Sequence, residues 1–166
     1  MLWFYIKSKV MIKIKFHIGI IILFITTFSL AQKAPTPELN LQIVKIIKSN
    51  INKTIDRGEC WDLANLVLSE TNAKWDHQFG FGREIKYSID SIYAGDIIQF
   101  TNAKIQMADG VVWRFGQHTA IIYEIDKNKK IKIAHQNVNN VRKVIISDFE
   151  PEGLIEGKLK IYRPIK

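Results

Sequence analysis

The 166-residue chain contains a single cysteine, Cys60. One thiol cannot form an intramolecular disulfide, and it cannot supply the two to four thiolates of a cysteine-based zinc site. Apolar residues make up 47% of the chain and charged residues 24%, a balance typical of globular rather than disordered proteins. The length predicts one domain with a core of its own. Cys60 is therefore either a small buried hydrophobe or a reactive thiol.

The sequence also lacks a dense basic stripe, although its formal net charge is +8. Four of the 24 basic residues and none of the 16 acidic ones lie in residues 1–31, so the rest of the chain carries 20 basic against 16 acidic residues, or +4. Only Lys129, Lys130 and Lys132 lie close together. Nucleic-acid binding needs a denser basic surface with aromatic side chains between the charges, so we expect no nucleic-acid partner.

No apolar run is long enough to span a bilayer. The longest, residues 18–30, falls short of the roughly 20 residues that a transmembrane helix needs. It follows a lysine-rich segment and ends in the small residues Ser29 and Ala31, the pattern of a secretory signal peptide. We expect residues 1–31 to be cleaved from an exported, periplasmic or extracellular protein with no stable membrane span. A retained membrane anchor is the alternative.

Helix signals dominate the first part of the mature chain, after a short linker at residues 32–36. Thr36 is suited to cap a helix, with Pro37 at its first position and Glu38 favoured by the helix dipole. Apolar residues then follow helical spacing as far as residue 50. A second amphipathic helix is expected to begin near residue 59 or 60 and to end near residue 70.

Beyond residue 80 the pattern changes to short strands. Stretches rich in β-forming residues are 97–100, 104–107, 111–115, 118–125, 130–135, 142–146 and 159–163. Turn residues at 108–110 and 126–128 predict hairpins, and Gly95-Asp96 is better explained as a turn at a strand entry than as a catalytic acid. Helices followed by an antiparallel meander predict an α+β fold, with a helical layer on the sheet and one domain over residues 37–166.

Cys60 lies in the segment Gly58-Glu59-Cys60-Trp61-Asp62, at the first turn of the second predicted helix. The helix dipole and the unpaired backbone N–H groups at that end favour a thiolate. A histidine later in the chain could accept the thiol proton, and a third polar group could orient its ring.

Two histidines are placed to meet. His118 opens a strongly β segment, and His135 ends the next one, followed by Gln136 and Asn137. The short turn between the segments makes them neighbours, so we expect His118 to lie near His135 or Asn137. Alternation along a strand puts His135 and Asn137 on one face and Gln136 on the other. The alternative is that these are hydrogen-bonded structural histidines.

Four motifs occur in the order seen in one family. They are Gly-Glu-Cys-Trp-Asp-Leu-Ala (58–64), Ala-Gly-Asp-Ile-Ile-Gln-Phe (94–100), Gln-His-Thr-Ala-Ile-Ile (117–122) and His-Gln-Asn (135–137). Together they resemble CHAP domains, which are cysteine- and histidine-dependent amidohydrolases and peptidases related to the NlpC-type cell-wall peptidases. The resemblance covers roughly residues 50–165 and implies a papain-like fold, with N-terminal helices on an antiparallel sheet or half-barrel.

The resemblance implies that Cys60 is the nucleophile and His118 the general base. Asn137 matches the family's asparagine. His135 stands where CHAP domains usually carry glutamate, although NlpC-type relatives often use a histidine as third member. Either residue is thus a candidate to orient His118, and a neutral His135 would not supply the glutamate's negative charge.

The implied reaction is hydrolysis of an amide through a thioacyl intermediate, without cofactor or metal. The backbone N–H of Cys60 would form part of the oxyanion hole, and Trp61 and Gln117 would line the substrate cleft. The family points to peptidoglycan, or another peptide, as the substrate.

Three alternatives remain. One is a catalytically silent module of the same fold that binds a wall peptide or a partner protein. Another is a metalloenzyme using His77, His118 and His135, which no His-x-x-x-His spacing supports. The third is a thiol acyltransferase acting on lipid, although in such relatives the histidine precedes the cysteine.

Overall fold

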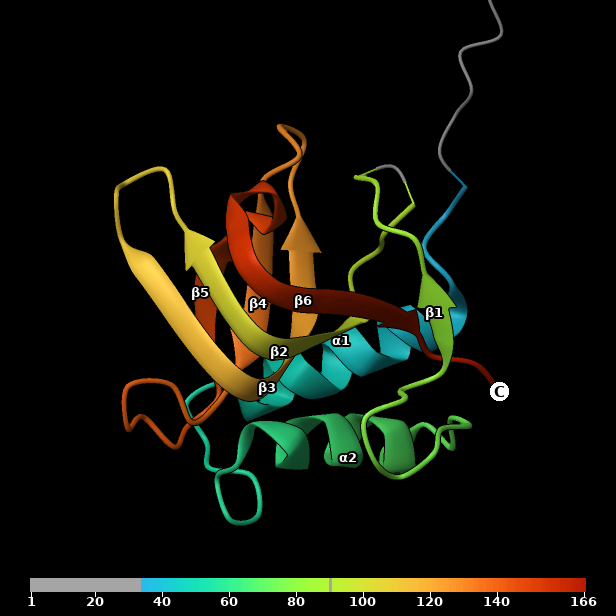
Figure 1. Ribbon diagram of the computed structural model, residues 1–166. Coiled ribbons are helices and arrows are strands. Elements are labelled where there is room, and N and C mark those ends of the chain that lie inside the picture. Colours follow the sequence, from blue (N-terminus) through green and yellow to red (C-terminus); the bar gives the residue numbers. More distant parts are fainter. Residues whose placement is uncertain (1–33, 90) are drawn as a thin grey trace, which may run out of the picture. The chain divides into compact units, whose positions relative to one another are not determined.

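Two helices pack on one face of a six-stranded antiparallel sheet (Figure 1). This computed structural model describes residues 34–89 and 91–166, so the predicted signal peptide lies outside the described residues. The elements are α1 (Glu38–Asn50), α2 (Cys60–Glu70), β1 (Arg83–Ile85), β2 (Ile97–Gln106), β3 (Val112–Ile125), β4 (Ile131–His135), β5 (Ile145–Phe149), the short 3₁₀ helix η1 (Pro151–Gly153) and β6 (Leu154–Arg163). The strand order is β1-β6-β2-β3-β4-β5. The predicted α+β fold is confirmed.

The start of α2 is fixed by a reciprocal capping box. The Glu59 side chain accepts the backbone N–H of Asp62, and the Asp62 carboxylate accepts the N–H of Glu59 at 2.9 Å. Helix α1 has no such side-chain cap: Pro37 occupies the N-cap position, and its carbonyl accepts the N–H of Leu41 at 3.1 Å. The prediction that Thr36 caps α1 is therefore wrong. No helix among the described residues is long and apolar enough to cross a membrane.

The sheet has fewer and longer strands than the sequence predicts. The segments 97–100 and 104–107 join as β2, and 111–115 and 118–125 join as β3. Where β2 pairs with β6 the register shifts, which lets the chain bend without ending the strand.

Other strand boundaries move or appear anew. Strand β5 lies three residues beyond the predicted 142–146, β6 begins five residues before the predicted 159–163, and β1 was not predicted. Both predicted turns are confirmed: Met107 N–H bonds to the Val111 carbonyl at 2.8 Å, and Asp126 N–H to the Lys130 carbonyl at 3.0 Å.

Apolar side chains bury both faces of the central strands. One cluster joins the helices to one face of the sheet, and in β3 it includes Ile121. The other covers the opposite face, where β3 contributes Ala120 and Ile122. Because side chains alternate along a strand, His118 shares the face of Ala120 and Ile122, whereas Thr119 shares the face of Ile121.

A buried carboxylate ties α1 to the end of β6 and to the turn before β2. Asp96 has no exposed surface and accepts hydrogen bonds from Arg163 at 2.7 and 3.0 Å, from Asn40 at 2.8 Å and from the backbone N–H of Tyr93 at 2.9 Å. Gly95 precedes it at φ +88°, where an added Cβ would lie 2.6 Å from the Asn40 carbonyl oxygen. The strand-entry turn is thus confirmed, and Asp96 serves the fold.

Replacing this carboxylate should destabilise the domain strongly. We expect Asp96→Ala to lower the free energy of unfolding by about 3–5 kcal/mol, because Arg163 would be left largely buried without its partner. Urea denaturation followed by circular dichroism measures the change. Asp148→Ala, on an exposed position of β5, is the matched control, with an expected change within about 0.5 kcal/mol. Equal effects of the two substitutions would contradict this role for Asp96.

Candidate active site

The thiol of Cys60 lies at the start of α2 and against strand β3. The side chain is partly buried, and the backbone N–H groups of Thr119 and Trp61 point to the sulfur. Burial raises the pKa of the thiol above its ordinary value; these N–H groups oppose that rise, and the nearby Glu59 carboxylate adds to it. The backbone N–H groups at the helix start thus favour a thiolate as expected, but desolvation outweighs them.

The loop before Cys60 is held by residues that follow β4. Gln136 donates to the backbone carbonyls of Glu59 at 2.6 Å and Ile55 at 3.1 Å. Asn137 donates to the Glu59 carboxylate at 2.6 Å, and Arg142 donates to its other oxygen at 2.7 Å. These contacts set the position of the helix start, and so that of the thiol.

The two candidate histidines form a buried pair. His118 Nε2 lies 3.1 Å from His135 Nδ1, and His135 Nε2 lies 3.0 Å from Ser147 Oγ on β5. Phe115 stacks on the His118 ring, with centroids 4.4 Å apart and planes 10° from parallel. The expected approach of His118 to His135 is confirmed.

Asn137 does not take the expected place beside His135. Strand β4 ends at His135, and Asn137 adopts a left-handed conformation with φ of 61°. Alternation therefore stops, and Asn137 turns with Gln136 toward Glu59. The prediction that His135 and Asn137 share a face is wrong for this reason.

Burial keeps both rings neutral at physiological pH. It lowers the pKa of His118 to about 3, with a smaller contribution from the neighbouring His135, and it lowers the pKa of His135 to about 4. Neither His118 nor His135 therefore carries a charge at physiological pH.

The thiol lies beside the peptide that joins His118 to Thr119, since the Thr119 N–H points to the sulfur. The His118 side chain, which binds His135 through Nε2, points to the opposite face of the sheet, with Ala120 and Ile122. Within residues 34–89 and 91–166, no hydrogen bond joins the thiol to His118. The structure therefore brings Cys60 to the backbone of this strand and not to the imidazole ring of His118.

The two predicted cleft residues have different neighbours. Trp61 follows Cys60, donates its indole N–H to the Gln78 carbonyl at 2.7 Å and packs on Trp75 at 5.5 Å between ring centroids. Gln117 precedes His118 and accepts a hydrogen bond from Gln99 at 3.0 Å. Both are adjacent in sequence to a candidate catalytic residue.

Sequence reasoning missed three polar side chains at this site. Gln99 and Thr119 are buried and joined by a 2.7 Å hydrogen bond from the Thr119 hydroxyl, and Ser147 contacts His135. Their partners come from other strands. Only the polar interruptions in otherwise apolar strands could have signalled them.

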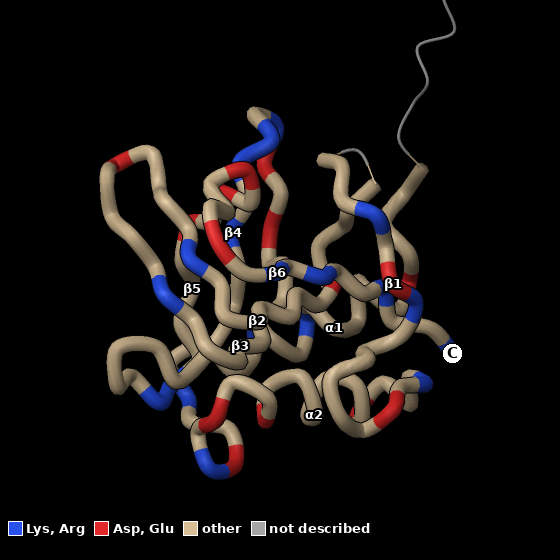
Figure 2. The backbone as a smooth tube through the Cα atoms, in the orientation of Figure 1, with Lys and Arg blue, Asp and Glu red and all other residues tan. Residues whose placement is uncertain are grey.

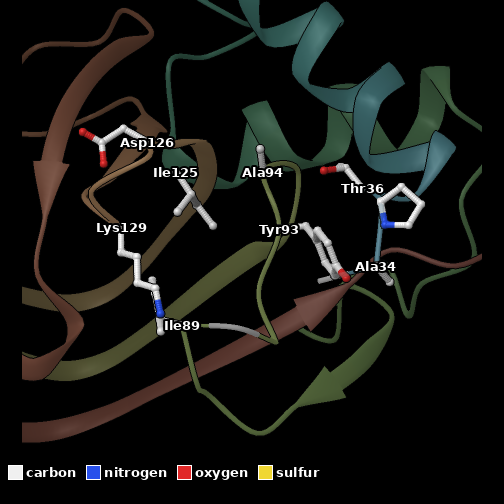
Figure 3. Close-up of a pocket in the computed structure, with 9 residues that line it drawn as sticks. Ala34, Thr36, Ile89, Tyr93, Ala94, Ile125, Asp126 and Lys129 are labelled. Carbon is white, nitrogen blue, oxygen red and sulfur yellow. The ribbon is translucent and has the colours of Figure 1, made fainter. Parts of the chain in front are cut away.

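Two pockets flank other parts of the domain. One of about 380 Å³ lies where α1 begins, between Thr36, Tyr93 and Lys129, and includes neither Cys60 nor His118 (Figure 3). Another of about 400 Å³ is lined by Ser147 together with Trp113 and Phe115. Among the described residues, no three His, Cys, Asp or Glu side chains form a group suited to a metal ion.

Charges are interleaved along the described part of the chain. Figure 2 shows lysine and arginine on separate strands and loops, with aspartate and glutamate between them. At the start of α2, Glu59 pairs with Arg142 at 2.7 Å and Asp62 pairs with Arg57 at 2.7 Å.

Two helices packed on a six-stranded antiparallel sheet, with a thiol at a helix start, are consistent with the papain-like fold of cysteine proteinases. Residues 38–166 match the AIM3/BBC1 cysteine proteinase-fold domain, and the chain belongs to this family. The resemblance to CHAP domains holds at the level of this fold.

Among curated proteins, the chain is similar to "Altered inheritance of mitochondria protein 3" of Debaryomyces hansenii, with 27% identity over 139 residues. The match covers 71% of this chain and only 15% of that protein's length. Among solved structures, two titled "The crystal structure of Ly7917" and "The crystal structure of Ly7917 with the hydrolyzing product of MDP" align with a TM-score of 0.47 and 12% identity. Each alignment covers 75% of this chain and 62% of the other.

The buried histidine pair predicts loss of stability in mild acid. Because both folded-state pKa values lie below the ordinary value near 6.5, the unfolded chain binds more protons, and stability falls as the pH drops from about 6.5 toward 4. Urea midpoints between pH 7 and 5, above most carboxylate titration, measure the effect.

The double variant His118→Gln/His135→Gln should lose most of this dependence. His77→Gln, at an exposed position, is the matched control and should keep the wild-type slope. An unchanged slope in the double variant would show that the acid sensitivity arises elsewhere.

Proposed function

We propose that this domain is a cysteine amidohydrolase or peptidase, with Cys60 as nucleophile, His118 as general base and His135 as the residue that orients His118. The observation that carries the proposal is the match of residues 38–166 to a cysteine proteinase-fold domain, with the thiol of Cys60 at the start of α2. In a papain-like fold, a thiol, a base and an orienting group are the parts that acyl transfer requires.

The neutral resting state sets the order of events. With the pKa of Cys60 raised and that of His118 lowered, a preformed thiolate and imidazolium are disfavoured. In the proposed step His118 takes the proton as the sulfur attacks the amide carbonyl carbon, and the carbonyl electrons move to oxygen; this requires the His118 ring to leave the face of Ala120 and Ile122 and reach the thiol. The backbone N–H of Cys60 at the helix start is one donor for that oxyanion.

The second half of the reaction reverses the proton path. His118 returns the proton to the leaving amine as the C–N bond breaks, which leaves a thioester on Cys60. Water then attacks the thioester with His118 as base, releasing the acid product and the thiol. This sequence uses only residues of the chain, and Trp61 and Gln117 flank the nucleophile and the base as cleft residues.

Of the two candidate orienting residues, His135 takes this role in the proposal. Its ring contacts His118 directly, whereas the Asn137 side chain binds Glu59. Asn137 instead supports the loop that positions the nucleophile.

For the substrate, we propose a peptide amide of peptidoglycan, cleaved by an exported protein. The support is the signal-peptide pattern of residues 1–31 and the motif resemblance to CHAP domains. The matched curated relative belongs to a yeast, so the wall substrate rests on these sequence features alone.

A silent binding module is the second candidate function. It is favoured by the raised pKa of the thiol and by the lack, within residues 34–89 and 91–166, of a hydrogen bond between Cys60 and His118. Such a module would hold the same peptide class without cleaving it.

Removing the thiol distinguishes the proposed hydrolase from the silent binding module. We expect Cys60→Ala to reduce hydrolysis of purified peptidoglycan and of fluorogenic peptide amides by about a thousandfold or more, because no nucleophile remains. Product release is measured by chromatography and fluorescence, and circular dichroism checks the fold. Ser69→Ala, on an exposed position of α2, is the control and should keep wild-type rates.

Full activity in Cys60→Ala would refute the mechanism. Undiminished binding of peptidoglycan by both proteins, with no hydrolysis by the wild type, would establish the module instead.

A further inference from the structure

A hydrogen-bonded line of three side chains lies on the sheet face that points away from the helices. Ser147 Oγ on β5 lies 3.0 Å from His135 Nε2, and His135 Nδ1 lies 3.1 Å from His118 Nε2. Phe149, two residues beyond Ser147, belongs to the apolar cluster of that face, and side chains two apart in a strand share a face. The line therefore lies opposite Cys60, and the mechanism proposed for the thiol does not use Ser147.

These three side chains have the order of a catalytic triad. In such triads a hydroxyl nucleophile is hydrogen-bonded to one ring nitrogen of a histidine, and the other ring nitrogen is hydrogen-bonded to an orienting group. Both separations in the line fall within the range of roughly 2.6–3.2 Å that this arrangement requires. The line thus holds a nucleophile, a base and an orienting group in sequence.

We infer that Ser147 is the nucleophile of a second site, an esterase site, with His135 as its general base and His118 as the group that orients His135. The substrate class is an ester with an uncharged, apolar acyl group. The inference goes beyond the proposed function, because it assigns a separate reaction to the opposite face of the sheet. It uses His118 where the structure places it, whereas the step proposed for Cys60 requires that ring to move.

Ser147 is the member of the line that a substrate can reach. His135 is fully buried and His118 is 4% exposed, whereas Ser147 is half-buried and lines the pocket of about 400 Å³. The base is thus shielded from bulk water, while the residue that it activates borders space for a ligand.

The lining of that pocket favours an apolar acyl group. Its walls are mostly apolar side chains from β3, from the loop after β4 and from the start of β5, among them Trp113, Val138 and Ile145. Among the described residues that line it, Arg114 alone carries a charge. The apolar walls would bury the acyl chain, and Arg114 is the cation available to the carbonyl oxygen as that oxygen becomes negative.

The first half of the reaction begins with Ser147 donating its O–H to His135 Nε2. In this tautomer His135 donates its Nδ1–H to His118 Nε2, and His118 keeps its own proton on Nδ1. The serine oxygen bonds to the ester carbonyl carbon, its proton passes to His135 Nε2, and the carbonyl electron pair moves to oxygen. That proton then goes to the leaving alcohol as the C–O bond breaks, which leaves an acyl ester on Ser147.

The second half of the reaction uses water at the same atoms. His135 takes a proton from the water as the water oxygen attacks the acyl carbon, and Ser147 regains a proton as the acid product leaves. One ester and one water are consumed, and one alcohol and one acid are released. The reaction therefore needs no oxidant, reductant or other co-reactant.

The neutral orienting group restricts the reaction to esters. His118 is an uncharged imidazole and supplies no negative charge to a protonated His135, and burial lowers the pKa of His135 to about 4. The line is therefore a weak base, and a weak base suits a carbonyl carbon that is more electrophilic than that of an amide. Esters meet this requirement.

A fluorophosphonate probe tests the nucleophile in the full chain. Such a probe bonds its phosphorus to an activated serine oxygen and releases fluoride. Ser147 is the only residue with a hydroxyl side chain in the tryptic peptide 144–158, so mass spectrometry assigns its adduct directly. We expect Ser147 to react at least about 100-fold faster than the exposed Ser69, the gain typical of a positioned base.

Removing the base shows whether this reactivity comes from the line. His135→Gln should slow the labelling of Ser147 by about 100-fold, whereas His77→Gln, at an exposed position, is the matched control and should leave it unchanged. Circular dichroism checks the fold of both variants. If Ser147 of the wild type reacts no faster than Ser69, it only satisfies a buried ring nitrogen, and the inference is overturned without any variant.

Hydrolysis of p-nitrophenyl butyrate tests the reaction itself. Because a thiol can also attack this ester, the assay starts from Cys60→Ala. We expect Cys60→Ala/Ser147→Ala to be about a thousandfold slower than Cys60→Ala. Cys60→Ala/Ser69→Ala is the matched control and should keep the rate of Cys60→Ala. Equal rates in the two double variants would overturn the inference.

Failure of this inference is distinguishable from failure of the proposed function. If Cys60→Ala loses peptide-amide hydrolysis and Ser147 is unreactive toward the probe, only the esterase site fails. If Ser147 is reactive and Cys60→Ala keeps its amide hydrolysis, only the thiol mechanism fails.

Discussion

The antiparallel register of β3 and β4 is the constraint on which the site depends. Ile121 pairs with Ala134 and Ile122 with Ile133, so His118 and His135 emerge on the same face, one diagonal step apart. A shift of one residue would turn one of the two rings toward the helices and separate them. Apolar burial on both faces holds the register, since any slip would also move Ile121 and Ile122 out of their clusters.

The same burial that fixes the geometry removes charge from the site. Two imidazoles and a thiol are withdrawn from water, and within the described residues the only carboxylate that acts on the thiol is Glu59, which is bound to Asn137 and Arg142. Desolvation then shifts all three groups toward their neutral forms.

Local patterns predicted much of the fold. The boundaries of α2, the two hairpin turns and the meeting of His118 with His135 followed from spacing and turn residues alone, because each depends on neighbours in the sequence. The signs of the pKa shifts did not follow, since they depend on how deeply the sheet buries each group. Ser147 was out of reach for a related reason: its place beside His135 is set by the pairing of β4 with β5, across a loop whose length does not determine register.

The His-Gln-Asn segment shows how one short stretch joins the two halves of the site. His135 ends β4 inside the sheet and bonds to His118, and then the backbone leaves the strand conformation. Because alternation stops there, both Gln136 and Asn137 turn to the same loop and hold Glu59 by its carbonyl and its carboxylate. Three consecutive residues thus contact His118 on one side and the loop before α2 on the other. The left-handed conformation of Asn137 ends the alternation of the strand. This one segment can therefore contact both His118 and Glu59.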